Sequence, residues 1–141
     1  MKEINAPYEI PSHVRYAQIG YFIFSWILFV CIIVQVYLAG VAFFDNSAAW
    51  DWHTIFIHMF EYIAIVMFVL GFIGKMPRGL IWGSLGLFAL FNIQYFTAHG
   101  FIGALHPVLA LVLFWWSLTL ARGSFRLIKQ NRQSSEEVND K

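Results

Sequence analysis

Four long apolar segments dominate the chain, and short polar stretches separate them. A helix needs about 20 predominantly apolar residues to cross the hydrocarbon core of a bilayer, and each segment is close to that length or longer. They predict transmembrane helices at about residues 17–44, 52–73, 80–97 and 102–121. Because the connections are short, sequential helices should be antiparallel neighbours. The pattern therefore predicts an all-α integral membrane protein, an up-down four-helix transmembrane bundle.

Basic residues gather at one end of this predicted bundle. They lie before the first helix, between the second and third, and after the fourth: Lys2, Arg15, Lys75, Arg78, Arg122, Arg126, Lys129 and Arg132. The other two connections contain no Lys or Arg. Cytoplasmic loops carry the excess of these residues, so we expect a multi-pass membrane protein with both termini in the cytoplasm. The chain then divides into an N-terminal segment (1–15), a transmembrane domain (16–122) and a polar cytoplasmic tail (123–141).

The composition agrees with a chain whose main partner is the lipid bilayer. Hydrophobic residues make up 60% of the sequence and charged residues only 12%, about half of what soluble domains carry. The net charge of +1 gives no general attraction to nucleic acid. Cys31 is the single cysteine, which excludes an internal disulfide and argues against a thiolate metal cluster.

Polar side chains collect at the opposite end, which is the outer end in this orientation. Histidines stand near the start of the second and fourth helices and after the third, and glutamines lie in the first and third. The set consists of Gln35, His53, His58, Glu61, Gln94, His99 and His106. Polar and ionisable groups within membrane helices are costly and usually mark functional sites. We therefore expect these residues to line a cofactor-binding site in the outer half of the bundle.

The second helix carries three of these residues and Thr54 on one face. At about 100° per residue, His53, Thr54, His58 and Glu61 occupy less than half of the circumference. Such a face should look into the bundle. Glu61 follows His58 by three residues, so the two side chains can meet. A carboxylate that accepts a hydrogen bond from a histidine fixes the tautomer and strengthens the other nitrogen as a metal ligand.

The fourth helix supplies a histidine at a defined place. Pro107 lacks an N–H and is tolerated in the first turn, so the helix should begin at or just before it. His106 then lies at nearly the depth of His53. The second and fourth helices face each other across the bundle diagonal, about 12–14 Å when adjacent axes are about 8–10 Å apart. That leaves room for one haem b, with His106 as one axial ligand and His53 or His58 as the other.

Other sites stay open at this point. A non-haem zinc or iron site could use the histidines and Glu61, although His53 and His58 are about 140° apart around the helix. A quinone site could use a histidine and Glu61 with Tyr62 or Tyr95, alone or beside haem. The two glutamines could simply bond across helices to hold the bundle together. Hydrolytic catalysis has no support, because no serine or cysteine nucleophile is convincingly paired with a base.

Four short motifs carry a resemblance. They are "QVYLAG" (residues 35–40), "WHTIFIH" (52–58), "NIQYF" (92–96) and "LHP" (105–107). The chain resembles a family of small four-helix prokaryotic membrane proteins of unknown function. Its layout is also distantly similar to one half of haem A synthase and to four-helix membrane cytochromes b, in which outer histidines on alternate helices hold haem. That likeness implies ligands at His53 or His58 and at His106. The outer connections here lack the Arg or Lys that would pair haem propionates, so His99, loop amides and water would take that place.

The leading hypothesis is a small membrane-embedded b-type haem protein with bis-histidine ligation near the outer side. It would serve electron transfer, with quinol as one candidate partner, or haem handling for a respiratory oxidase. The alternatives are a haem-free accessory or structural subunit of a membrane complex, and a quinone- or lipid-binding module. Two axial histidines close the metal to substrate, so whether the protein is an enzyme stays open.

Overall fold

The computed structural model describes residues 10–139, and every regular element in that range is a helix. In chain order the elements are α1 (Ser12–Phe44), α2 (Ala49–Phe60), α3 (Ile63–Ile73), α4 (Arg78–Phe96), the short 3₁₀-helix η1 (Phe101–Leu105) and α5 (His106–Asn139). Four stretches are long and apolar enough to cross a membrane: Ser12–Phe44, Ala49–Ile73, Arg78–Phe96 and Phe101–Glu136. For the described range, the predictions of an all-α chain and of four candidate spans are confirmed. Insertion into a bilayer stays an expectation from length and composition.

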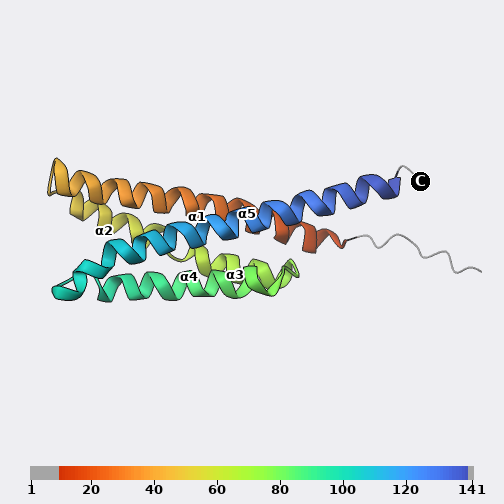
Figure 1. The fold of residues 1–141 in the computed structure, drawn as a ribbon. Coiled ribbons are helices and arrows are strands. Elements are labelled where there is room, and N and C mark those ends of the chain that lie inside the picture. The colour runs from red at the N-terminus through yellow and green to blue at the C-terminus, as the bar shows by residue number, and fades with distance from the viewer. Residues whose placement is uncertain (1–9, 140–141) are drawn as a thin grey trace, which may run out of the picture.

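The spans run side by side along the bundle (Figure 1), and each contacts two others. α1 packs against α5 and against both α2 and α3, and α4 packs against α3 and α5. This is the neighbour order expected of an up-down bundle. The two described chain ends and the connection at residues 74–77 lie at one end of the bundle, here called the terminal end (Figure 1). The opposite end has the connections at residues 45–48 and 97–100 together with η1, and is called the histidine end.

The second span, predicted as a helix over residues 52–73, contains a turn at one point. α2 ends at Phe60, Glu61 and Tyr62 form a turn, and α3 begins at Ile63. There the Ala64 N–H donates to the carbonyl of Glu61, three residues back, at 3.4 Å. A tightened turn inside a helix often marks a functional hinge or strain. The distortion falls at Glu61, the carboxylate in the interior of the second span, whose partners are His58 on α2 and Tyr95 on α4.

The last helix begins where it was predicted and ends much later. α5 starts at His106, one residue before Pro107, as the missing proline N–H requires. It continues to Asn139, well beyond the expected end near residue 121. Residues 123–139, expected as a polar tail, are therefore a helical extension of α5 that projects past the bundle (Figure 1).

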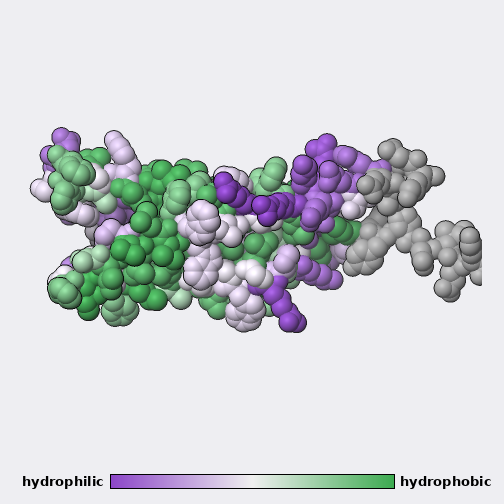
Figure 2. Space-filling view, viewed as in Figure 1, coloured by the Kyte–Doolittle hydropathy of each residue, from purple (hydrophilic) through white to green (hydrophobic). Residues whose placement is uncertain are grey.

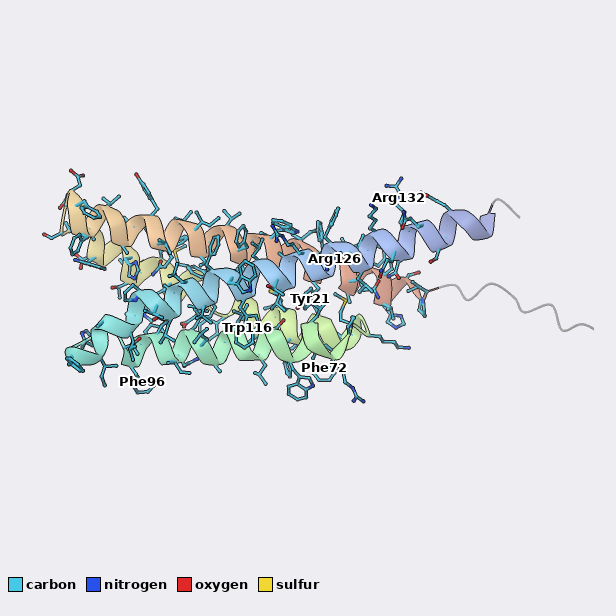
Figure 3. The ribbon with its side chains drawn as sticks, in the orientation of Figure 1. Tyr21, Phe72, Phe96, Trp116, Arg126 and Arg132 are labelled. Carbon is cyan, nitrogen blue, oxygen red and sulfur yellow. The ribbon has the colours of Figure 1, made fainter. Side chains whose placement is uncertain are left out.

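Polar bonds tie the extension of α5 to the terminal end. Asn131 on the extension donates to the side-chain oxygen of Gln18 on α1 at 2.9 Å, and Gln18 in turn donates to the carbonyl of Gly74 at 2.9 Å. Arg126 and Arg132 also lie on this part of α5 (Figure 3). Hydrophilic residues gather around the terminal end and the extension, whereas apolar residues cover much of the bundle between its ends (Figure 2). This distribution suits a helix bundle that meets water at its ends and lipid along its length.

The terminal half of the bundle is a close-packed core of small and aromatic residues. Tyr21, fully buried, donates from its hydroxyl to the carbonyl of Leu80 at 2.8 Å and lies 2.9 Å from the Ser84 hydroxyl (Figure 3). Gly86 on α4 lets Trp116 on α5 approach so closely that an added Cβ would stand 2.7 Å from the indole ring. Such contacts fix the spacing of α1, α4 and α5 from the middle of the bundle to the terminal end.

Candidate functional site

His53 on α2 and His106 at the start of α5 lie next to each other at the histidine end. Their ring centroids are 6.4 Å apart, with the ring planes inclined by 54°. Both residues are partly buried. The two elements belong to the diagonal pair of spans, as the sequence predicted. Of the two candidates on the second span, His53 is the one that the fold places beside His106.

Each histidine of this pair is held by a backbone carbonyl of a glutamine. His53 Nδ1 lies 3.0 Å from the carbonyl oxygen of Gln35 on α1, and His106 Nδ1 lies 3.1 Å from that of Gln94 on α4. A carbonyl oxygen only accepts, so Nδ1 must carry the proton in both rings. In a neutral imidazole the other nitrogen, Nε2, then has a free lone pair. Histidines that ligate metals almost always have such a hydrogen bond on the nitrogen away from the metal.

The helix ends explain one of these bonds. Gln94 lies in the last turn of α4, where carbonyls lack a partner within the helix. His106 and the Thr97 hydroxyl, which donates to the Gln94 carbonyl at 3.1 Å, satisfy that oxygen. Thr97 was not among the predicted residues. Its position three residues after Gln94, at the end of an apolar helix, was the only signal in the sequence.

The Gln35 bond is reinforced from the other side. The Gln35 side-chain NH₂ donates to the carbonyl of His53 at 2.8 Å, so the two residues exchange a pair of hydrogen bonds between α1 and α2. Trp50 packs its ring edge-on to the His53 imidazole, with centroids 5.5 Å apart. The side-chain oxygen of Gln35 is buried and has no partner within the described residues. A polar atom of this kind beside His53 is an acceptor that a bound molecule could satisfy.

The ring separation suits two imidazoles on one metal. A histidine nitrogen binds its metal at about 2.0–2.1 Å, and with roughly 1.1 Å from that nitrogen to the ring centre, two rings in line on one ion have centres about 6.3 Å apart. The observed value is 6.4 Å. Among the described residues, no group of three or more His, Cys, Asp or Glu is arranged to hold a metal ion. Two histidines are fewer ligands than a metal ion held by protein side chains alone requires.

The bundle is also more open around this pair. α3 packs against both α1 and α4, whereas α2 packs against α1 and makes no comparable contact with α4. Of the α2 residues only Ala49 and Phe60 are buried, and η1 has no buried residue. α2 therefore packs less tightly into the bundle than α3 does.

A second polar cluster lies deeper along the second span. Glu61 is 5% exposed, and the Tyr95 hydroxyl on α4 donates to its Oε2 at 2.6 Å. His58 Nδ1 lies 3.2 Å from Glu61 Oε1 and 3.2 Å from the Tyr95 hydroxyl. The His58 and Tyr95 rings are stacked, with centroids 5.4 Å apart and planes inclined by 12°. The His58–Glu61 contact predicted from their spacing is present.

The predicted residues thus form two clusters, and two of them, Thr54 and His99, belong to neither. The prediction that the whole face of the second helix looks inward is wrong for Thr54, which is exposed, and for His58, whose side chain is 57% exposed. Their direction depends on how α2 leans against α1, which periodicity alone does not give. His99 is exposed in the connection after α4, and no hydrogen bond to its ring is found within the described residues.

Comparison with known proteins gives a partial match. Residues 35–100 match a family described as a family of unknown function, DUF6220. The matched part, a little under half of the chain, runs from Gln35 through α2, α3 and α4 to Gly100. No curated protein and no solved structure matches the chain. Similarity to a DUF6220 segment is therefore found, and similarity to haem A synthase or to cytochromes b is not.

Proposed function

We propose that the protein is a small membrane-embedded b-type haem protein with His53 and His106 as axial ligands. The observation that carries the proposal is the paired arrangement of the two rings: a separation that suits one metal, and both Nδ1 atoms bonded to glutamine carbonyls. When bound, haem would supply an iron that gains and loses one electron. The function we propose is electron transfer by a haem held at the histidine end.

The chain's own residues would set the properties of such a site. The carbonyls of Gln35 and Gln94 orient the imidazoles and raise their basicity as ligands. Two histidine ligands would complete the coordination of the iron and would favour electron transfer over oxygen chemistry. No Lys or Arg lies between residues 16 and 74 or between 79 and 121, so propionates at the histidine end would be solvated or bonded to His99 and loop amides.

The proposed setting is the prokaryotic plasma membrane with the terminal end in the cytoplasm. Support comes from the four apolar spans and from the basic residues of the terminal end and the α5 extension. The histidine pair would then lie toward the outer surface. Haem handling for a respiratory oxidase would use the same pair, but closed axial positions suit a resident haem better than one that is passed on.

A haem-free structural subunit is the second candidate. The Gln35–His53 pair of bonds and the His106–Gln94 bond join helices without any cofactor, and polar contacts of this kind can stabilise a membrane bundle by themselves. In that case removal of either histidine would lower the stability of the protein but remove no chromophore.

The test is the absorption spectrum of the full chain purified in mild detergent, as isolated and after dithionite, with an iron count. We expect a sharp α-band on reduction that is absent from both His53→Ala and His106→Ala. His13→Ala is the matched control, because this histidine is exposed in the first turn of α1 at the terminal end, and it should retain the band. No Soret band in wild-type protein expressed with added haem would overturn the proposal.

A further inference from the structure

Glu61 is a carboxylate at a position where burial of a charged group costs free energy. It lies about halfway along the Ala49–Ile73 span and is 5% exposed, at the turn between α2 and α3. A carboxyl group at the middle of a bilayer is rare and usually belongs to a proton or substrate path. The His53–His106 pair does not use it, because each of these histidines donates from Nδ1 to a backbone carbonyl, that of Gln35 or Gln94.

Both oxygens of Glu61 are engaged by the side chains that cover it. Tyr95 donates to Oε2 at 2.6 Å, and His58 Nδ1 faces Oε1 at 3.2 Å. If His58 donates from Nδ1 to the carboxylate, its Nε2 has the free lone pair. The His58 side chain is 57% exposed on the outside of the bundle. Lipid tails offer no donor to such an atom, so an acceptor is left open toward the membrane interior.

The exposed Nε2 of His58 and the stacked rings of His58 and Tyr95 define what kind of ligand can bind here. The ligand must be soluble in the lipid interior, carry an O–H donor for His58 Nε2, and be flat enough to lie against the stacked rings of His58 and Tyr95. A phospholipid fails because its polar groups stay at the membrane surface. A metal ion fails because the described residues hold no group of three ligands. A hydroquinone meets all three conditions.

We propose that His58, Glu61 and Tyr95 form a binding site for the head group of a lipid-soluble hydroquinone that enters from the bilayer. The inference rests on the proposed function in one respect: it names the electron donor to the haem. Oxidation of the hydroquinone to the quinone releases two electrons and two protons. The group that His53 and His106 would hold would accept the electrons one at a time, and a one-electron redox protein at the histidine end would reoxidise it. One proton goes to His58 Nε2, and the second goes to the Glu61 carboxylate through the Tyr95 hydroxyl.

The two sites are close enough in the fold to act together. Tyr95 follows Gln94 directly, and the Gln94 carbonyl holds His106. The same turn of α4, next to Phe96 at its histidine end (Figure 3), therefore contacts the proton acceptor on one side and the proposed axial ligand on the other. The cluster lies on the lipid side and the histidine pair nearer the end of the bundle.

The experiment measures binding of a short-tailed hydroquinone, decylubiquinol, to the full chain in lipid nanodiscs by calorimetry, with and without haem. We expect Tyr95→Phe and Glu61→Gln each to weaken binding at least tenfold. Tyr95→Phe keeps the ring and removes only the donor, so it distinguishes lost chemistry from lost folding. Tyr62→Phe is the matched control, since Tyr62 is exposed on the same turn and outside the cluster; it should bind like wild type.

The outcomes separate this proposal from the previous one. Weak or absent binding by wild-type protein that has a normal haem spectrum would overturn the hydroquinone site alone. Binding that is unchanged in both variants would also overturn it, because the molecule would then lie elsewhere. Tight, variant-sensitive binding by protein that never takes up haem would support the site while the haem proposal fails.

Discussion

The two halves of the bundle use polar side chains in opposite ways. In the terminal half, polar groups bond to one another and to carbonyls inside the chain: Tyr21 to Leu80 and Ser84, and the Ser25 hydroxyl to that of Ser124 at 3.0 Å. These residues are buried in a close-packed core. The hydrogen-bonding capacity of these side chains is used by the fold itself. The exception in this half is the buried indole N–H of Trp26, which has no partner within the described residues.

In the histidine half, several polar atoms have hydrogen-bonding capacity that the fold does not use. The Nε2 atoms of His53 and His106 are free once each Nδ1 donates to a glutamine carbonyl, and the Gln35 side-chain oxygen is buried without a partner. α2 reaches α4 through side chains such as His58 and Tyr95, and the two helix backbones are not closely packed here. Polar groups that merely stabilise a membrane bundle would be expected to look like the terminal half. The contrast is what separates a candidate site from structural polar contacts.

The largest effect on stability is expected from Gly86→Ala in the terminal half. Its new Cβ would stand 2.7 Å from the rigid indole ring of Trp116, so the α4–α5 contact must open. Overpacking of this kind destabilises by about 1–3 kcal/mol. Thermal unfolding in detergent measures it. Gly40→Ala is the matched control, because nothing lies within 4 Å of its added Cβ, and this variant should be as stable as wild type or slightly more so.

A smaller loss is expected from Tyr21→Phe, which keeps the packed ring and removes the hydroxyl. The carbonyl of Leu80 retains the Ser84 donor at 3.0 Å, so only the hydroxyl's own bonds are lost, about 0.5–1.5 kcal/mol. Tyr37→Phe on the exposed side of α1 serves as control. Neither variant should alter haem content; a changed absorption spectrum in Tyr21→Phe would show that the two halves are coupled and would weaken the comparison.

The smallest effect on the proposed haem is expected from Gln94→Leu. The Gln94 backbone carbonyl, not its side chain, holds His106, and the side-chain oxygen only accepts from Thr97 at 3.2 Å. The reduced spectrum should therefore keep its band positions, with at most a loss of stability of about 1 kcal/mol. Loss of haem in Gln94→Leu would mean that the glutamine side chain, rather than the carbonyl, matters to the site.

Much of the fold follows from one-dimensional patterns. The four spans follow from the apolar runs, and the start of α5 follows from Pro107, whose missing N–H fits only the first turn of a helix. The length of α5 did not follow. Its polar extension bonds to α1 through Asn131 and Gln18, 113 residues apart in the chain, and such a contact leaves no mark in local composition.

The sequence could predict which residues belong to the site, but not how they contact one another. Helical spacing correctly joined His58 to Glu61, but it could not tell that Tyr95 completes that cluster, because the direction of α2 relative to α4 depends on packing. It also treated His53 and His58 as alternatives for one role. They are about 140° apart on the helix, and the fold assigns them to different partners, Gln35 and Glu61. The carbonyl bonds to the histidines involve no side-chain chemistry of the glutamines and so had no sequence signal.

The central claim is that His53 and His106 together hold one haem iron. Electron paramagnetic resonance of the oxidised full chain, with haem quantified in the same sample, tests it most directly. We predict one haem per chain with a low-spin ferric signal in wild type, converted to high spin or lost when His53 becomes alanine. A haem that stays low-spin in both His53→Ala and His106→Ala, or a chain with no haem at all, would contradict the account.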